Sequence, residues 1–201
     1  MNKILVCMWY DENIKEYADL FRKINEKYCN DNNYDLIFSD KKYTDKPPSF
    51  NRLFFIKELL EKNEYDYYMW IDADAHFCGN QYLIENYINK YEDKDFIWSA
   101  DITPNINTGV FIVKNSEYSK EFIQKWIRSS KTINKDWWEQ GVFGVLWNDN
   151  ILDIKNHSYV YHYGVLQHFK YTDSQLVYHM AGTDKNTRIK YSRFLEHKLI
   201  Y

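Results

Sequence analysis

Several features that would assign a protein to a special class are scarce in this chain of 201 residues. Its three cysteines, Cys7, Cys29 and Cys78, are odd in number and widely spaced, which excludes a disulfide framework and paired zinc ligands and indicates a reducing compartment. No segment approaches the roughly 18 apolar residues of a membrane span. The apolar run at residues 4–10 is too short for a signal peptide. We therefore predict a cytoplasmic protein without a membrane span.

The chain also has no large excess of positive or negative charge. The net charge is −3, and acidic and basic residues are interspersed, whereas a nucleic-acid site needs a clustered basic face. We therefore predict no nucleic-acid partner. No repeat, linker or low-complexity tract divides the chain, so residues 1–201 are predicted to form a single domain with one core.

Aromatic residues, in contrast, are abundant at 19% of the chain. Two interpretations remain open. The first is a compositional bias, because Asn, Lys and Ile are frequent as well. The second is a groove lined with aromatic faces that receive sugar or base rings.

The hydrophobic pattern predicts an α/β fold with a mostly parallel mixed sheet flanked by helices. Strands are predicted at residues 4–8, 35–38, 67–71, 96–98 and 110–113, and helices near 14–28, 50–63, 82–88, 116–127 and 138–147. Ser49 and Ser116 are predicted to cap two of these helices. Residues 151–178 are less regular and predict a small second sheet. In such folds ligands bind beyond the carboxyl ends of the strands.

The most informative motif is Asp72-Ala-Asp74, directly after the buried strand at 67–71. Two carboxylates at the end of a buried strand are unfavourable unless a positive charge lies between them, and hard divalent cations prefer such oxygens. Asp93-Lys-Asp95 has the same spacing but lies in a polar segment. Context therefore favours the first copy as a metal site.

The second motif is His179-Met-Ala-Gly182-Thr-Asp-Lys185. A neutral imidazole beside two carboxylates is a suitable metal ligand and shifts the preference from Mg²⁺ toward Mn²⁺. Gly182 permits close backbone approach to a phosphate, and Lys185 supplies a positive charge for it. The alternative is a core histidine followed by a solvated turn.

Polar residues elsewhere suit a polyol ligand. Asn107-Thr-Gly109 precedes a strand, where it forms either a plain turn or hydrogen bonds to hydroxyls. Asp101 closes another strand and can accept bonds from sugar hydroxyls. Glu139 can stabilise positive charge developing at a sugar carbon, and Gln140 can hold hydroxyls. The alternative for Glu139 is an exposed acid at a helix start.

Taken in order, these motifs resemble those of the GT-A nucleotide-sugar glycosyltransferases. The resemblance is greatest to the fungal galactosyl- and mannosyltransferase and plant xyloglucan xylosyltransferase family, and it extends more distantly to the glycogenin-like galactosyltransferases. It spans residues 4–185 and rests on Ser49-Phe-Asn-Arg52, Trp70-Ile-Asp-Ala-Asp-Ala75, Asn107-Thr-Gly-Val-Phe111, Glu139-Gln140 and His179-Met-Ala-Gly182.

The resemblance implies a Rossmann-like GT-A domain that is metal-dependent. Residues 1–100 would form the nucleotide-binding half, and residues 101–201 the half for donor sugar and acceptor. The enzyme would move a hexosyl, deoxyhexosyl or pentosyl unit from a nucleoside-diphosphate sugar, with a UDP-sugar expected, to a glycan or other hydroxyl acceptor. The implied cofactor is Mn²⁺ or Mg²⁺.

The resemblance also implies residue roles. Asp72, Asp74 and His179 would hold the metal, and Glu139, Gln140 and Asp101 would be catalytic. Nucleotide, phosphate and sugar contacts would come from the remaining motif positions, which are Trp9, Tyr10, Asp11, Arg52, Ala73, Asn107, Gly182 and Lys185.

Some positions depart from the family pattern. The acid before Gln140 is Glu139 rather than the commoner Asp, and Trp138 stands where relatives often have another acid. Two other classes remain as alternatives. A haloacid-dehalogenase-like phosphoryl transferase also begins with Asp-x-Asp, but there Thr or Val follows in place of Ala75. The other is a non-catalytic glycan-binding domain built on the aromatic residues.

Overall fold

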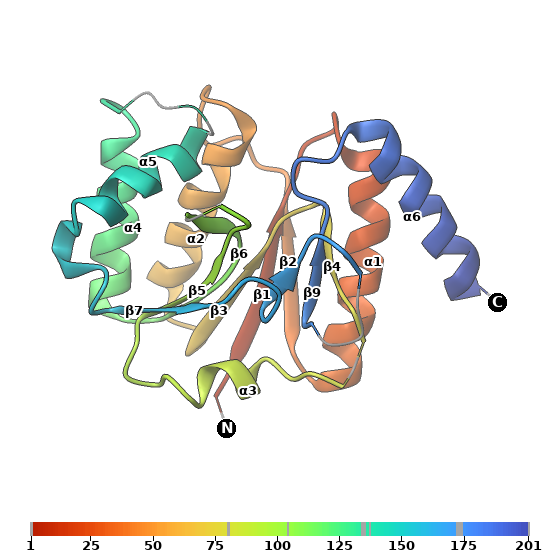
Figure 1. The fold of residues 1–201 in the computed structure, drawn as a ribbon, viewed down its shortest axis with the longest axis horizontal. Coiled ribbons are helices and arrows are strands. Elements are labelled where there is room, and N and C mark those ends of the chain that lie inside the picture. Colours follow the sequence, from red (N-terminus) through yellow and green to blue (C-terminus); the bar gives the residue numbers. More distant parts are fainter. Residues whose placement is uncertain are drawn as a thin grey trace.

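The computed structural model describes residues 2–79, 81–103, 105–133, 136, 138–171 and 175–200, and Figure 1 shows its fold. The strands are β1 (Ile4–Trp9), β2 (Asp35–Ser39), β3 (Tyr67–Ile71), β4 (Ala75–Phe77), β5 (Phe96–Ala100), β6 (Ile106–Lys114), β7 (Ser158–Tyr161), β8 (Gln167–His168) and β9 (Val177–His179). The helices are α1 (Lys15–Asn32), α2 (Asn51–Lys62), α3 (Glu85–Ile88), α4 (Glu117–Ser129), α5 (Trp138–Asn148) and α6 (Lys185–Ile200), with 3₁₀ turns η1 (Pro48–Phe50) and η2 (Ile151–Asp153).

Six strands form the central sheet in the order β2-β1-β3-β6-β5-β7. Within this sheet β6 runs opposite to the other five, because it pairs antiparallel with both β3 and β5. A small second sheet has the order β4-β9-β8. The predicted α/β class, with a mostly parallel mixed sheet and a small second sheet, is confirmed.

Alternating side chains divide the core into two layers, one on each face of the central sheet. Leu5, Cys7 and Trp9 of β1 pack with the apolar faces of α2, α4 and α5. Ile4 and Val6 instead pack with α1, α3, β4 and β9. Figure 1 shows α2, α4 and α5 on one side of the sheet and α1 and α6 on the other. Because β1 and β3 are covered on both faces, they read as continuous apolar runs in the sequence.

The fold brings distant chain ends to one edge of the central sheet. Asp72 follows the carboxyl end of β3. Because β6 is antiparallel to β3, its beginning at Asn107 lies at that same edge. The pairing register of β5 and β6 also shifts between Ile97 and Ser99, so the start of β6 is locally irregular. His179 reaches this edge from β9, which pairs with β4 just after the acids.

Some sequence predictions about local structure were wrong. The helix predicted at 82–88 is the single turn α3, preceded by the unpredicted strand β4. The C-terminal helix α6 was not predicted. Ser49 lies within η1 and makes no cap, and its buried hydroxyl has no hydrogen-bond partner among the described residues. Ser116 does cap α4, because its hydroxyl accepts the backbone N–H of Ser119 at 3.1 Å.

Within the described residues, no helix combines the length and the apolar character that crossing a bilayer requires. The cytoplasmic location inferred from the sequence stays a prediction.

The two candidate capping serines form a matched pair for a stability test. We expect Ser116→Ala to lower the free energy of unfolding by about 1 kcal/mol, because the variant loses the N-cap of α4. We expect Ser49→Ala to change it by less than about 0.5 kcal/mol, because its hydroxyl makes no bond to lose. Urea denaturation of both variants measures this, and equal losses would contradict the assignment of the caps.

Candidate active site

A tight turn between β3 and β4 carries the two acids. The backbone N–H of Asp72 donates to the carbonyl of Gly109 at 2.8 Å, and the N–H of Ala75 donates to the carbonyl of Asp72 at 3.0 Å. The carbonyl of Asp74 accepts the N–H of Met180 at 3.0 Å, which ties the turn to the end of β9. These backbone hydrogen bonds therefore fix the positions of Asp72, Asp74 and His179 relative to one another.

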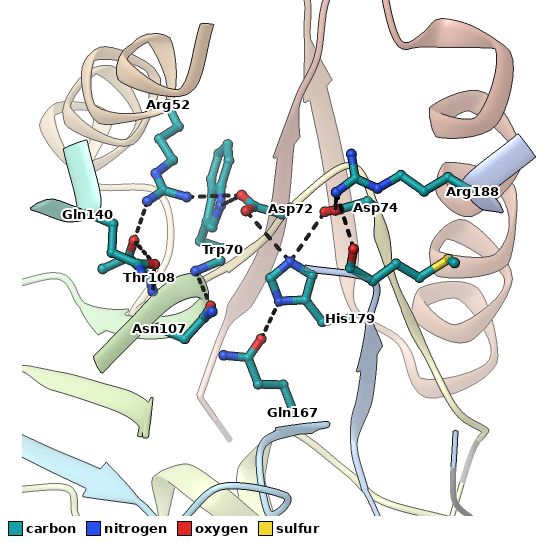
Figure 2. A network of polar contacts seen from close by, with 12 residues as sticks. Arg52, Trp70, Asp72, Asp74, Asn107, Thr108, Gln140, Gln167, His179 and Arg188 are labelled. Atoms are coloured by element: carbon teal, nitrogen blue, oxygen red, sulfur yellow. Dashed lines mark hydrogen bonds and ion pairs between the residues drawn. The ribbon is translucent and has the colours of Figure 1, made fainter. Parts of the chain in front are cut away.

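The side chains of Asp72, Asp74 and His179 converge (Figure 2). One ligand atom from each lies within 4.8 Å of the other two, as binding of a single metal ion requires. Nε2 of His179 is 3.3 Å from Oδ1 of Asp74 and 3.9 Å from Oδ2 of Asp72. The structure thus brings together the three residues that the sequence predicted as metal ligands.

Each carboxylate directs one oxygen toward His179 and the other toward an arginine. Oδ1 of Asp72 accepts from Arg52 at 3.0 Å and from the Trp70 indole at 2.7 Å, which leaves Oδ2 for the cluster. Oδ2 of Asp74 pairs with Arg188 at 2.5 Å, which leaves Oδ1. Two oxygens therefore remain free of arginine and face the imidazole.

The imidazole is oriented from behind by Gln167. Nδ1 of His179 lies 2.6 Å from the amide oxygen of Gln167, an atom that can only accept, so Nδ1 carries the hydrogen. The lone pair of a neutral ring then lies on Nε2 and faces two carboxylate oxygens. That donor set of one imidazole nitrogen and two oxygens fits a divalent cation such as Mn²⁺. Both His179 and Gln167 are buried, so solvent does not replace this contact.

Charge and burial shift the pKa values of the three groups. Burial raises the pKa of Asp72 against the opposing effect of Arg52. Burial alone would also raise the pKa of Asp74, but His179 and Arg188 outweigh it and hold that pKa below its usual value. Burial disfavours a charged His179, yet the two aspartates outweigh burial and raise its pKa. The pocket therefore favours a positive charge at the position that the three residues share.

Gly109 leaves the space beside the cluster open. A Cβ atom at this position would lie 2.3 Å from Cε1 of His179 and 2.8 Å from Oδ2 of Asp72. Contacts that short do not occur between non-bonded atoms, so any larger residue would displace the imidazole or the carboxylate. Glycine is required here by close approach, and its amide is held by Oδ1 of Asn107 at 2.8 Å.

A second buried network joins the acids to α5. Arg52, only 3% exposed, donates to Asp72, to the Thr108 hydroxyl and to Oε1 of Glu139. Gln140 accepts from the Thr108 N–H at 3.1 Å and from its hydroxyl at 3.2 Å. Oε2 of Glu139 is buried and has no partner among the described residues. The predicted Arg52, Asn107, Glu139 and Gln140 therefore lie in one connected wall beside the metal cluster.

The first loop lies beside the start of α6. Trp9 ends β1, and its indole donates to the Lys41 carbonyl at 2.8 Å. Tyr10 is buried, and its hydroxyl donates to Asp19 at 2.5 Å. The Asp11 carboxylate accepts the N–H of Asn13 at 3.0 Å. Lys185 is the remaining predicted residue in this region. Its Nζ donates to the Asn13 carbonyl at 2.7 Å, so its ammonium group contacts this loop.

Three other predicted residues have simpler settings. Ala73 is buried between the two acids. Gly182 has a φ of 70°, a conformation that favours glycine, in the turn between β9 and α6. Asp101 follows β5, and its carboxylate accepts the N–H of Ile102 at 2.7 Å.

Sequence reasoning missed two residues that contact the cluster directly, Gln167 and Arg188. Gln167 lies in the short strand β8, which carries no pattern of its own. Arg188 follows Lys185 by three residues, which is one helical turn, so recognising α6 would have indicated that both side chains share a face.

Two solved structures to which this fold is similar are glycosyltransferases. A glycosyltransferase involved in the glycosylation of the major capsid of PBCV-1 is similar with a TM-score of 0.79, at 17% identity, over 95% of this chain and 98% of that chain. The glycosyltransferase GlyE of Streptococcus pneumoniae TIGR4 is similar with a TM-score of 0.52, at 15% identity, over 80% of this chain and 45% of that chain. The fold is therefore a glycosyltransferase fold.

The chain belongs to the family described as "Protein of unknown function, DUF273", whose model matches residues 25–141. It is 24% identical over 117 residues to galactomannan galactosyltransferase 1 of Cyamopsis tetragonoloba, covering 53% of this chain and 26% of that protein. It is 26% identical over 78 residues to probable glycosyltransferase 6 of Oryza sativa subsp. indica, covering 35% of this chain and 16% of that protein. The matches thus span 26% or less of the length of these curated relatives.

Gly109 provides a direct test of the cluster geometry. We expect Gly109→Ala to abolish stabilisation of the protein by Mn²⁺, because the added methyl group occupies the space between His179 and Asp72. Thermal unfolding with and without Mn²⁺ measures this effect. The matched control is Gly144→Ala in α5, where a Cβ meets nothing within 4 Å. That variant should keep the response to Mn²⁺ and gain about 0.5–1 kcal/mol of stability. An undiminished Mn²⁺ response in Gly109→Ala would contradict the site.

Proposed function

We propose that this chain is a metal-dependent glycosyltransferase. It moves a glycosyl unit from a nucleoside-diphosphate sugar, with UDP-sugar as the expected donor, to a glycan or other hydroxyl acceptor. The observation that carries the proposal is the convergence of Asp72, Asp74 and His179 at the carboxyl edge of the central sheet. The fold shared with glycosyltransferases and the sequence similarity to a galactosyltransferase support it.

The metal ligands in this proposal are Oδ2 of Asp72, Oδ1 of Asp74 and Nε2 of His179. These are the three atoms that Arg52, Arg188 and Gln167 leave free (Figure 2). When bound, a divalent metal supplies Lewis-acid stabilisation to a departing diphosphate. Gln167 fixes the tautomer of His179, and Trp70 and Arg52 hold Asp72 in place, so the ligands need little rearrangement to bind.

The wall formed by Arg52, Thr108, Glu139 and Gln140 is the proposed donor-sugar side. The unpartnered oxygen of Glu139 is available for a sugar hydroxyl or for positive charge that develops at the anomeric carbon. Arg52 positions Glu139 relative to the metal ligands, because one guanidinium contacts both Asp72 and Glu139. Asn107 and Asp101 complete the proposed polyol contacts.

The loop at residues 9–11 is the proposed base-binding segment. Because the Tyr10 ring is buried and packs against the tilted ring of Phe38 with ring centroids 4.1 Å apart, its contribution would come from the backbone. The partly exposed Asp11 would offer its carboxylate. Ala73 and Gly182 would let the nucleotide approach the backbone. In this proposal, residues 1–100 serve the nucleotide and residues 101–201 the sugar and acceptor, within one catalytic domain.

This proposal accounts for more of the molecule than the two alternatives do. A glycan-binding domain has no use for three converging ligands and two arginine–carboxylate networks beside them. A haloacid-dehalogenase-like reaction uses the first aspartate as a nucleophile, whereas Asp72 here is held by both Arg52 and Trp70. Membership of the fungal and plant transferase family that the motifs resemble is likewise a proposal, supported by similarity to the Cyamopsis galactosyltransferase.

The two Asp-x-Asp copies supply a matched test of this function. We expect Asp74→Asn to lower Mn²⁺-dependent release of UDP from UDP-sugars by more than about 100-fold, because even outer partners of a metal ligand contribute about 10- to 100-fold. Chelation with EDTA should abolish the activity of the unmodified protein.

The control for Asp74→Asn is Asp93→Asn. Asp93 has the same spacing to its partner acid, but its side chain is 72% exposed and pairs only with its neighbour Lys94 among the contacts described. This variant should retain full activity. Full UDP release by Asp74→Asn, or by the unmodified protein in EDTA, would refute the proposed mechanism.

A further inference from the structure

Arg188 contacts the metal cluster from the opposite side to Arg52. It belongs to α6, and its Nη2 lies 2.5 Å from Oδ2 of Asp74 and 3.2 Å from the Met180 carbonyl. Nη1 lies 3.3 Å from the Tyr17 hydroxyl, and the guanidinium carbon is 5.6 Å from the centroid of the Tyr17 ring. The side chain is 20% exposed, so solvent or a ligand can reach it.

The two arginines beside the cluster weaken the binding of a metal ion alone. Three carboxylates, those of Asp72, Asp74 and Glu139, share two guanidinium groups, so most of their negative charge is already compensated before any metal binds. A divalent cation that enters between Asp72 and Asp74 brings two further positive charges close to both arginines, and like charges repel most strongly where water is excluded. An additional anion therefore strengthens metal binding at this position.

We propose that Arg188 couples metal binding to diphosphate binding. In the absence of ligand it holds Asp74, and when a metal–diphosphate complex binds, its guanidinium pairs with a phosphate oxygen. This inference rests on the proposed function, because it assumes that the donor carries a diphosphate. The planar fork of arginine suits phosphate, and the anion supplies the negative charge that the metal needs.

The structure favours Arg188 over the other two cations near the site. Arg52 is 3% exposed, and both of its terminal nitrogens are engaged by Asp72, Thr108 and Glu139. Lys185 is engaged by the Asn13 carbonyl. Arg188 combines partial exposure with direct contact to a metal ligand, which places its charge where metal and diphosphate meet.

Isothermal titration calorimetry with Mn²⁺ alone, and with UDP or inorganic pyrophosphate in saturating Mn²⁺, tests the coupling. We expect Arg188→Gln to bind Mn²⁺ alone about threefold or more tighter, because a repelling charge is gone. The same variant should bind UDP and pyrophosphate in the presence of Mn²⁺ about tenfold or more weaker, because it lacks the charge-assisted hydrogen bonds. Arg188→Lys retains the positive charge, so its affinities for Mn²⁺ and for the diphosphates should lie between those of the unmodified protein and those of Arg188→Gln. This variant replaces Arg188→Gln in the test if Arg188→Gln does not fold.

The control is Arg193→Gln, which removes another contact between α6 and α1. Arg193 pairs with Glu16 at 2.8 Å at an exposed site, so both affinities should match those of the unmodified protein. If Arg188→Gln weakens Mn²⁺ binding as well, Arg188 only holds Asp74 in position and the coupling is refuted. It is also refuted if Lys185→Gln loses diphosphate affinity while Arg188→Gln does not. If the unmodified protein binds UDP and pyrophosphate equally well with and without Mn²⁺, the proposed function itself fails.

Discussion

The site depends on positive charge that keeps two carboxylates together at the end of a buried strand. Asp72 and Asp74 would repel each other and resist burial without it. Arg52 reaches Asp72 from α2, on one side of the central sheet, and Arg188 reaches Asp74 from α6, on the other. His179 then faces the oxygens that the arginines leave free. Side chains from helices on both faces of the central sheet thus contact the turn that carries the two aspartates.

The reversed strand β6 makes this convergence possible. Because it runs against β3, its first residues lie beside Asp72 rather than at the far end of the sheet. Asn107, Thr108 and Gly109 then supply an anchor for the backbone, a partner for Arg52 and an open space for the cluster. A parallel strand at this position would bring its last residues to the same edge, and the Asn-Thr-Gly segment would lie at the opposite one.

The sequence was sufficient for the fold class and for the identity of the clustered residues, because both leave local patterns. Continuous apolar runs mark strands that are buried on both faces, and an acid pair at the end of such a run is unusual. The partners of these residues leave no local pattern, because Gln167 and Arg188 reach the cluster only through tertiary packing. The helix caps could not be assigned from the local sequence either. Ser49 and Ser116 look alike in sequence, but only Ser116 has its helix begin directly after it. Trp137, two residues before the predicted catalytic Glu139, lies outside the described residues.

The most direct test of the account is an anomalous difference map at the manganese absorption edge, from crystals of the protein grown with Mn²⁺ and UDP. We expect one strong peak in contact with Oδ2 of Asp72, Oδ1 of Asp74 and Nε2 of His179, next to density for the diphosphate. A map in which manganese lies elsewhere, with the Arg188–Asp74 pair and the His179 ring unchanged and no ion between them, would contradict it.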